Sequence, residues 1–239
     1  MRVSRNARSM LRCGAALAAV GAAAWAVRDY ARWRSLGPGG LPANVRGWVK
    51  MSIFRLRAAD ELNVAPIQSH IGRAYDRREW IAVRRRDGFR PSVSPYPVPH
   101  RQLSQLPDLA VRSALTDLFD RKVLDHADRV HYALSHFEKR NLAITLANPA
   151  GTVGGLSHGE IAHIHPSDNS MHMILSPSDA VPAIEMGWAQ RHGLAGIAVG
   201  LPVTYVMVYA PRSHDDLKVV EELLDAAIAY AVQPVVSPR

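Results

Sequence analysis

Residues 160–175 carry the feature that most constrains the fold of this chain. Two short apolar runs contain three histidines, and Pro166-Ser167-Asp168-Asn169 separates them. Each run has the composition of a strand, and the separator has that of a hairpin turn. Because residues two apart on a strand share a face, His163 and His165 point the same way. A two-residue turn would set His165 opposite His172, whereas a four-residue turn would set His163 opposite His172. Either register places all three imidazoles on one face.

Composition indicates a globular protein with a basic surface. The chain has 239 residues, of which 48% are hydrophobic and 21% are charged, so one sizeable domain with an appendage is expected. A single cysteine, Cys13, excludes an internal disulfide. The net charge of +8 comes from an excess of arginine in the N-terminal part, which we interpret as a solvated or membrane-facing surface. No nucleic-acid-binding motif accompanies these arginines, so no nucleic-acid partner is expected.

Residues 1–34 are predicted to form a basic segment and a membrane anchor. Residues 13–27 are uncharged and mostly alanine, with arginines on both sides. Fifteen helical residues reach about 22 Å of a hydrocarbon core that is roughly 30 Å thick, and snorkelling arginines could supply much of the difference. We expect a single-pass transmembrane helix in the endoplasmic reticulum membrane. A cleaved signal peptide and a buried alanine-rich helix are the alternatives.

Three further units are predicted along the chain. Residues 35–104 form a linker and an amphipathic, membrane-proximal region, because residues 35–47 are rich in glycine and proline while residues 48–56 and 71–83 combine apolar and basic side chains. Residues 105–232 form the compact catalytic domain, and residues 233–239 form a tail.

The periodicity of residues 105–232 predicts an α+β fold. Helical spacing covers residues 107–125, and strand-like runs cover residues 130–137, 142–146 and 204–209. Ser176 and Ser213 are expected helix caps, although Pro182 would interrupt or kink the first of these helices. We expect an antiparallel or mixed sheet with helices packed on one face, preceded by the transmembrane helix.

The three histidines allow more than one interpretation. Three imidazoles on one face could bind Zn²⁺ or Fe²⁺, could act as catalytic bases, or could be structural. Glu160 lies three residues before His163, so it faces away on a regular strand, and a bulge would be needed to bring it to the same side.

Several motifs resemble the fungal luciferase family in content and in order. The resemblance covers nearly the whole chain, including its hydrophobic N-terminus. It rests on Glu160-Ile-Ala-His163-x-His165, His172, Gly187-Trp188-x-Gln190-Arg191-His192-x-Leu194-Ala195-Gly196 and Tyr209-Ala210-Pro211-Arg212, and upstream on Asp29-Tyr30, Gly37-Pro38, Asn44-x-Arg46-Gly47, Phe54-Arg55 and Arg90-Pro91-Ser92.

This resemblance implies a luciferase that uses O₂ as co-substrate. The expected reaction oxidises and decarboxylates 3-hydroxyhispidin, an α-pyrone, through a peroxide to caffeoylpyruvate, CO₂ and light. No tightly bound cofactor is expected, with Zn²⁺ or Fe²⁺ at His163, His165 and His172 as the alternative. The other functions left open are a non-luminous relative acting on another phenolic or enolic substrate, with or without a metal, and a small-molecule binding protein.

Such a reaction needs a base, cationic partners for an enolate and a water-poor pocket with flat walls. The expected catalytic residues are His163, His165, His172, Arg191 and His192, and the expected substrate-binding residues are Glu160, Trp188, Tyr205, Tyr209 and Arg212.

Overall fold

The structure is a computed structural model that describes residues 5–73, 76 and 81–235. Its helices are α1 (Arg5–Ser35), α2 (Val45–Arg57), α3 (Ala65–Gln68), α4 (Leu109–Asp125), α5 (Pro177–Glu185), α6 (His214–Ala231) and the 3₁₀ helix η1 (Val153–Ser157). Its strands are β1 (Val130–Leu134), β2 (Leu142–Leu146), β3 (Glu160–Ile164), β4 (Met171–Ile174), β5 (Ala189–Arg191) and β6 (Tyr205–Val208).

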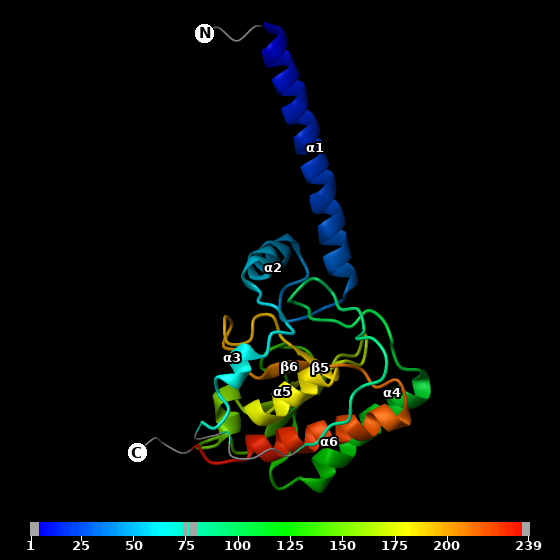
Figure 1. Cartoon of the computed structure of the whole chain (residues 1–239), viewed down its shortest axis with the longest axis vertical. Helices are drawn as coiled ribbons and strands as arrows, with labels where there is room; N and C mark the ends of the chain where they lie inside the picture. Colours follow the sequence, from blue (N-terminus) through cyan, green and yellow to red (C-terminus); the bar gives the residue numbers. More distant parts are fainter. Residues whose placement is uncertain (1–4, 74–75, 77–80, 236–239) are drawn as a thin grey trace.

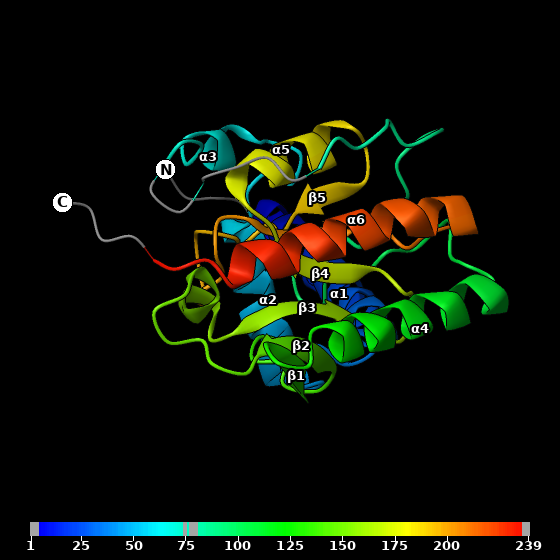
Figure 2. The ribbon, with the colours of Figure 1, turned by 90° about the horizontal axis from the view of Figure 1, so that it is seen from below.

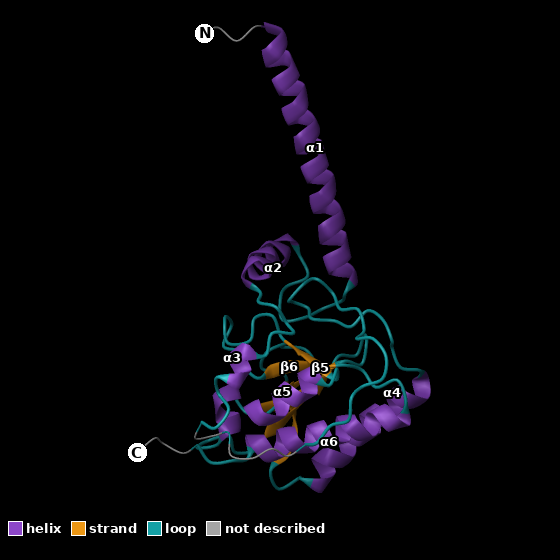
Figure 3. Ribbon diagram, viewed as in Figure 1, coloured by secondary structure: helices purple, strands orange, loops and turns teal. Residues whose placement is uncertain are grey.

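In the described part of the chain, these strands form one six-stranded sheet in the order β1-β2-β3-β4-β6-β5. Every neighbouring pair is antiparallel. The predicted α+β class is confirmed, and of the two predicted sheet types the antiparallel one is present. Figure 3 shows the strands gathered in the body of the molecule, with helices outside them.

Helices α4 and α6 cover one face of the sheet, as predicted (Figure 2). Helix α6 begins where Ser213 Oγ accepts a hydrogen bond from Asp216 N (3.2 Å), so the predicted cap is present. Its buried stripe includes Val220, Leu223 and Ala227, which belong to the main hydrophobic core. The spacing of these residues keeps them on one side of the helix, and their burial against the strands is the main force that holds this layer together.

The opposite face of the sheet is covered by the N-terminal part of the chain, with α2 lying above the sheet in Figure 1. Met51 and Phe54 of α2 belong to a second buried cluster, which also contains Tyr205 of β6. Close approach of α2 to the preceding loop requires Gly47, because a Cβ there would lie 1.9 Å from Pro42 O. The sheet therefore lies between two layers, and its second face is the one that carries the histidines.

Helix α1 extends away from this body (Figure 1). Among the described residues, no helix is both long enough and apolar enough to cross a membrane, so the predicted transmembrane helix is not found. The physical reason is composition, because the uncharged stretch of residues 13–27 is mostly alanine and arginines adjoin it on both sides.

Two segments of the chain were less clear from sequence. The second amphipathic stretch lies partly outside the described residues, and its described residues, 71–73, 76 and 81–83, form turns and irregular chain. The helix that Ser176 caps ends at Glu185 and contains Pro182, and residues 189–191 then form β5.

Candidate active site: a buried histidine cluster

The β3–β4 hairpin brings the three predicted histidines together. His163 pairs with His172 across the two strands, and His165 N donates to Ser170 O (2.8 Å), so the four-residue turn is the one that forms. The ring centroids are 5.2 Å apart for His163 and His165, 5.3 Å for His163 and His172, and 4.7 Å for His165 and His172. All three side chains are buried. Strand alternation therefore gathers the three rings on one face, as expected from the pattern.

A bulge brings Glu160 to the same cluster. The register between β2 and β3 shifts between Ile144 and Thr145, and Glu160 Oε1 then lies 2.7 Å from His163 Nδ1. Glu160 also accepts hydrogen bonds from Ser135 Oγ (3.0 Å) and from the backbone N–H of His136 (2.6 Å). Burial alone raises the pKa of Glu160, but the hydrogen bonds from His163 and Ser135 outweigh it and hold the pKa below its usual range. Glu160 is thus an ionised partner that orients His163.

Glu138 is the carboxylate that faces the histidine rings. Its oxygens lie 3.5 Å from His165 Nε2 and 3.8 Å from His163 Nε2. Arg101 holds the same carboxylate through contacts of 2.9 and 3.3 Å, and Asn141 Nδ2 donates to it at 2.6 Å. Burial by itself raises the pKa of Glu138, but its interactions with His165, His163 and Arg101 together outweigh burial and lower that pKa to about 2.

Sequence reasoning missed Glu138 and Arg101. Glu138 belongs to a four-residue polar stretch between β1 and β2 that looks like an ordinary hairpin turn, and Arg101 lies in proline-rich coil. Glu138 and Arg101 precede His163 by 25 and 62 residues in the sequence. Only folding of the chain brings them close to the histidines.

Two more histidines extend the cluster toward β5. The ring of His172 lies 5.4 Å from that of His192 and 5.5 Å from that of His100, which sequence reasoning also missed. Tyr205 stacks on His172 with a centroid distance of 4.6 Å and an interplanar angle of 23°. Burial lowers the pKa of His165, His172 and His192 well below that of free imidazole, and neighbouring positive groups act in the same direction. These rings are therefore neutral near pH 7.

A cavity of about 220 Å³ opens beside the cluster. The sheet side of its wall includes His172, His192 and Tyr205. The other walls come from the loop after α1, from α2, from residues 97–100, from residues 136–139 and from the loop between β5 and β6. Apolar side chains dominate these walls, and they are Leu41, Phe54, Pro97, Val98, Pro99, Phe137, Val199 and Leu201.

Two predicted aromatic walls lie elsewhere. Trp188 is buried in the main core, where its Nε1 donates to Arg84 O (2.6 Å). Tyr209 is also buried, and its hydroxyl donates to Gln190 Oε1 (2.8 Å). Neither residue lines the described cavity, in contrast to Tyr205.

The predicted cationic partners also have contacts away from the cavity. Arg191 Nη2 donates to Ala195 O (2.8 Å), and Arg212 Nε donates to Asp216 Oδ2 (2.7 Å) at the start of α6. The guanidinium nearest the histidine cluster is that of Arg101, through Glu138. A cationic group thus lies beside the histidines, but it belongs to Arg101 and not to Arg191 or Arg212.

Comparisons with known proteins identify the family of the chain. A family model described as the luciferase domain matches residues 158–227. The chain is 32% identical to the luciferase of Armillaria mellea and 31% identical to those of Neonothopanus nambi and Armillaria gallica, in each case over 233 residues. These alignments cover 91% of this chain and 85–86% of the relatives. The chain belongs to the fungal luciferase family.

This confirms the family predicted from the motifs. No solved structure matches the chain. The family model of the fungal luciferases covers the β3–β4 hairpin, β5 and β6 and therefore contains His163, His165, His172 and His192. Glu138, Arg101 and His100 precede the matched segment but lie in the same cluster.

Proposed function

We propose that this protein is a luciferase that oxidises and decarboxylates 3-hydroxyhispidin. One O₂ is consumed and one CO₂ is released, so that the products are caffeoylpyruvate, CO₂ and light. Membership of the fungal luciferase family supports the reaction class. The observation that carries the proposal is the mostly apolar cavity, whose wall includes the neutral imidazoles of His172 and His192 and the aromatic ring of Tyr205.

The first step is loss of the enol proton of the pyrone. Triplet oxygen reacts slowly with closed-shell molecules, but an enolate is electron-rich enough to transfer an electron to it. Neutral imidazole nitrogens of the cluster accept the proton, and a positioned base of this kind contributes about 10²- to 10⁴-fold. Oxygen then adds to the ring, a cyclic peroxide forms, and loss of CO₂ leaves excited caffeoylpyruvate.

His100 is placed to hold the enolate. Its Nε2 lies 3.0 Å from Gln190 Nε2, which can only donate, and 3.4 Å from Glu61 Oε1, which can only accept. The shorter contact, to Gln190, favours the tautomer with the proton on Nδ1. This Nδ1 is buried and has no hydrogen-bond partner among the residues that the structure describes, and the ring lines the cavity. An N–H of a ring that lines a mostly apolar cavity stabilises negative charge on a substrate oxygen that reaches it.

The activity is tested by adding the purified full-length protein to 3-hydroxyhispidin in air. Light emission that requires O₂, together with caffeoylpyruvate and CO₂ in equal amounts, is the expected result. Caffeoylpyruvate without light would identify a non-luminous oxygenase, and binding without turnover would identify a small-molecule binding protein. Either outcome, obtained with protein of native circular dichroism, contradicts the proposal.

A further inference from the structure

Three imidazoles of the cluster present the same ring nitrogen to a common point. His163 Nδ1 donates to ionised Glu160 (2.7 Å), which can only accept. His172 Nδ1 donates to the carbonyl oxygen of Val206 (3.2 Å), which also can only accept. In the neutral form of each ring, the second nitrogen, Nε2, is therefore the one with a free lone pair.

His165 is fixed in the same tautomer by a two-step chain. The hydroxyl of Ser170 donates to Asp168 Oδ1, so Ser170 Oγ accepts the hydrogen bond from His165 Nδ1 (2.9 Å). The Nε2 atoms of His163 and His165 are buried and have no hydrogen-bond partner within the described ranges of the chain. Buried polar atoms in native proteins usually have a partner, so two such atoms side by side indicate a missing ligand.

The spacing of the donor atoms fits a metal ion. One ligand atom from each of Glu138, His163, His165 and His172 can be chosen so that all lie within 4.8 Å of one another. The carboxylate of Glu138 lies 3.5 and 3.8 Å from the Nε2 atoms of His165 and His163. Ligand atoms of a tetrahedral ion with bonds of about 2.1 Å are about 3.4 Å apart, so small movements would complete the site.

The charge around these donors also favours a cation. Glu138, Glu160 and Asp168 contribute three carboxylates within the cluster, and Arg101 contributes the one guanidinium that contacts them in the described structure. Carboxylates thus outnumber cationic side chains around these donors. Buried carboxylates are costly without a counterion, and a divalent cation would supply one.

We propose that Nε2 of His163, His165 and His172 and the carboxylate of Glu138 bind one divalent transition-metal ion. Imidazole nitrogens select ions such as Fe²⁺, Co²⁺ or Zn²⁺ over Ca²⁺ and Mg²⁺. Glu160, Ser170 and Val206 O form the outer layer that fixes the ring tautomers, as partners of metal-binding histidines usually do. Glu138 and His172 line the cavity, so the ion borders the space for the substrate.

A second trio, His100, His172 and His192, also brings ring nitrogens within 4.8 Å of one another. His192 has both ring nitrogens engaged, because Nδ1 accepts from Leu194 N (3.1 Å) and the other nitrogen hydrogen-bonds to the backbone of Pro97. His192 therefore has no free lone pair to offer, and the Glu138 site is preferred.

The metal site is tested without substrate and does not rest on the proposed reaction. Purified full-length protein is stripped with a chelator, then titrated anaerobically with Fe²⁺ and with Co²⁺. The expected result is one equivalent of metal per chain, a Co²⁺ visible spectrum of nitrogen–oxygen ligation, and a higher Tm. Less than about 0.1 equivalent bound at micromolar metal would overturn the proposal.

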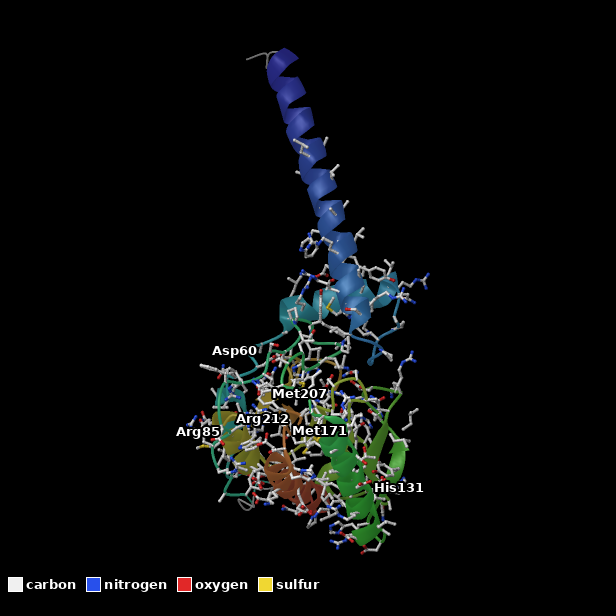
Figure 4. All side chains as sticks on the ribbon, turned by 90° about the vertical axis from the view of Figure 1, so that its right-hand side faces the viewer. Asp60, Arg85, His131, Met171, Met207 and Arg212 are labelled. Atoms are coloured by element: carbon white, nitrogen blue, oxygen red, sulfur yellow. The ribbon has the colours of Figure 1, made fainter. Side chains whose placement is uncertain are left out.

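Variants locate the ion. His165→Gln and Glu138→Gln are each expected to weaken metal affinity at least about 10-fold. His131→Gln is the matched control, because His131 is exposed on β1 and lies at the outer side of the molecule in Figure 4. Folding of every variant is checked by circular dichroism. Full affinity in a folded His165→Gln protein, or equal loss in His131→Gln, contradicts the assignment.

The two proposals fail separately. Metal-loaded protein that does not oxidise 3-hydroxyhispidin contradicts only the proposed function. Stripped protein that keeps full activity and rebinds no metal contradicts only the metal site. With the ion present, the Nε2 atoms of His163, His165 and His172 would be ligands, and the cation would supply positive charge that stabilises an enolate.

Discussion

At the scale of single residues, the site depends on which nitrogen of each imidazole carries the proton. Glu160 fixes His163 because its carboxylate can only accept hydrogen bonds. The other oxygen of Glu160 is occupied by the backbone N–H groups of His136 (2.6 Å) and Phe137 (3.3 Å). A glutamine at position 160 would therefore keep its oxygen on the backbone and turn its NH₂ group toward His163.

Glu160→Gln is predicted to reverse the tautomer of His163. An amide donor next to Nδ1 places the proton on Nε2, which removes the lone pair that faces Glu138. Activity is expected to fall about 10- to 100-fold. The ¹⁵N shifts of the His163 ring report the tautomer directly. Glu222→Gln, at an exposed position of α6, is the matched control. An unchanged His163 tautomer with full activity would show that Glu160 does not act in this way.

A second residue-scale prediction compares two buried tyrosines. Tyr205 lines the cavity and its buried hydroxyl has no hydrogen-bond partner within the described residues, whereas the hydroxyl of Tyr209 donates to Gln190. Tyr205→Phe is expected to keep or raise stability and to lower turnover, because the hydroxyl is free to bind substrate. Tyr209→Phe is expected to destabilise the fold by about 1 kcal/mol.

Urea unfolding and steady-state kinetics separate these two effects. The prediction for Tyr205 is wrong if Tyr205→Phe turns over normally, or if it loses as much stability as Tyr209→Phe.

The sequence predicted the convergence of His163, His165 and His172, because strand alternation is a local rule. It left the turn length open, and the structure selects the register with His163 opposite His172. Glu138 could not be predicted, since nothing within its polar turn distinguishes a residue that folds over the hairpin from one in solvent.

At the scale of elements, α2 carries a stripe of apolar side chains that are exposed to solvent. Val45, Val49, Ile53 and Leu56 are all exposed, with Leu56 at 87%. Their spacing of three or four residues places them along one side of the helix, and basic residues occur between them. An apolar stripe with basic flanks is typical of a helix that lies on an anionic bilayer surface. We propose that α2 makes such a contact.

Ile53→Asp is predicted to weaken binding to vesicles that contain anionic lipid at least about 10-fold, because burial of an isoleucine contributes about 1.5–3 kcal/mol. Leu124→Asp, at an exposed position of α4, is the control. Vesicle flotation measures both variants beside the wild type. Equal flotation of Ile53→Asp and wild type would remove α2 from membrane binding.

Most helices and strands could be predicted from sequence, and the three-residue strand β5 could not. The α6 helix has a regular apolar stripe and a serine cap, so its start at His214 was recognisable. Strand β5 has three residues, too few for any period, and it forms because β6 offers an open edge for Ala189–Arg191. The predicted transmembrane helix is not found among the described residues, because the uncharged part of α1 is short and mostly alanine.

At the scale of the whole molecule, the site is assembled from distant parts of the chain. Residues 105–232 supply the sheet and its histidines, but α2 and residues 97–100 supply cavity walls. Trp33 of α1 is buried, and its Nε1 donates to Val98 O (2.7 Å) next to the cavity. Asp29 of α1 accepts from Trp48 Nε1 (2.8 Å) and from Tyr96 Oη (2.9 Å). The last turns of α1 therefore support the site, while residues 14–24 of the same helix are exposed.

Two truncations are predicted to behave differently for this reason. Deletion of residues 1–24 removes the exposed residues 14–24 and none of these contacts, and should leave Tm within about 2 °C. Deletion of residues 1–34 also removes Asp29 and Trp33, and loss of a buried tryptophan costs about 3–5 kcal/mol. Because each kcal/mol lowers Tm by about 2–4 °C in a protein of this size, a fall of at least about 6 °C is expected. Turnover should fall only in the longer deletion, since the wall at Val98 loses its support there. Equal Tm and turnover for the two proteins would show that the cavity is complete without α1.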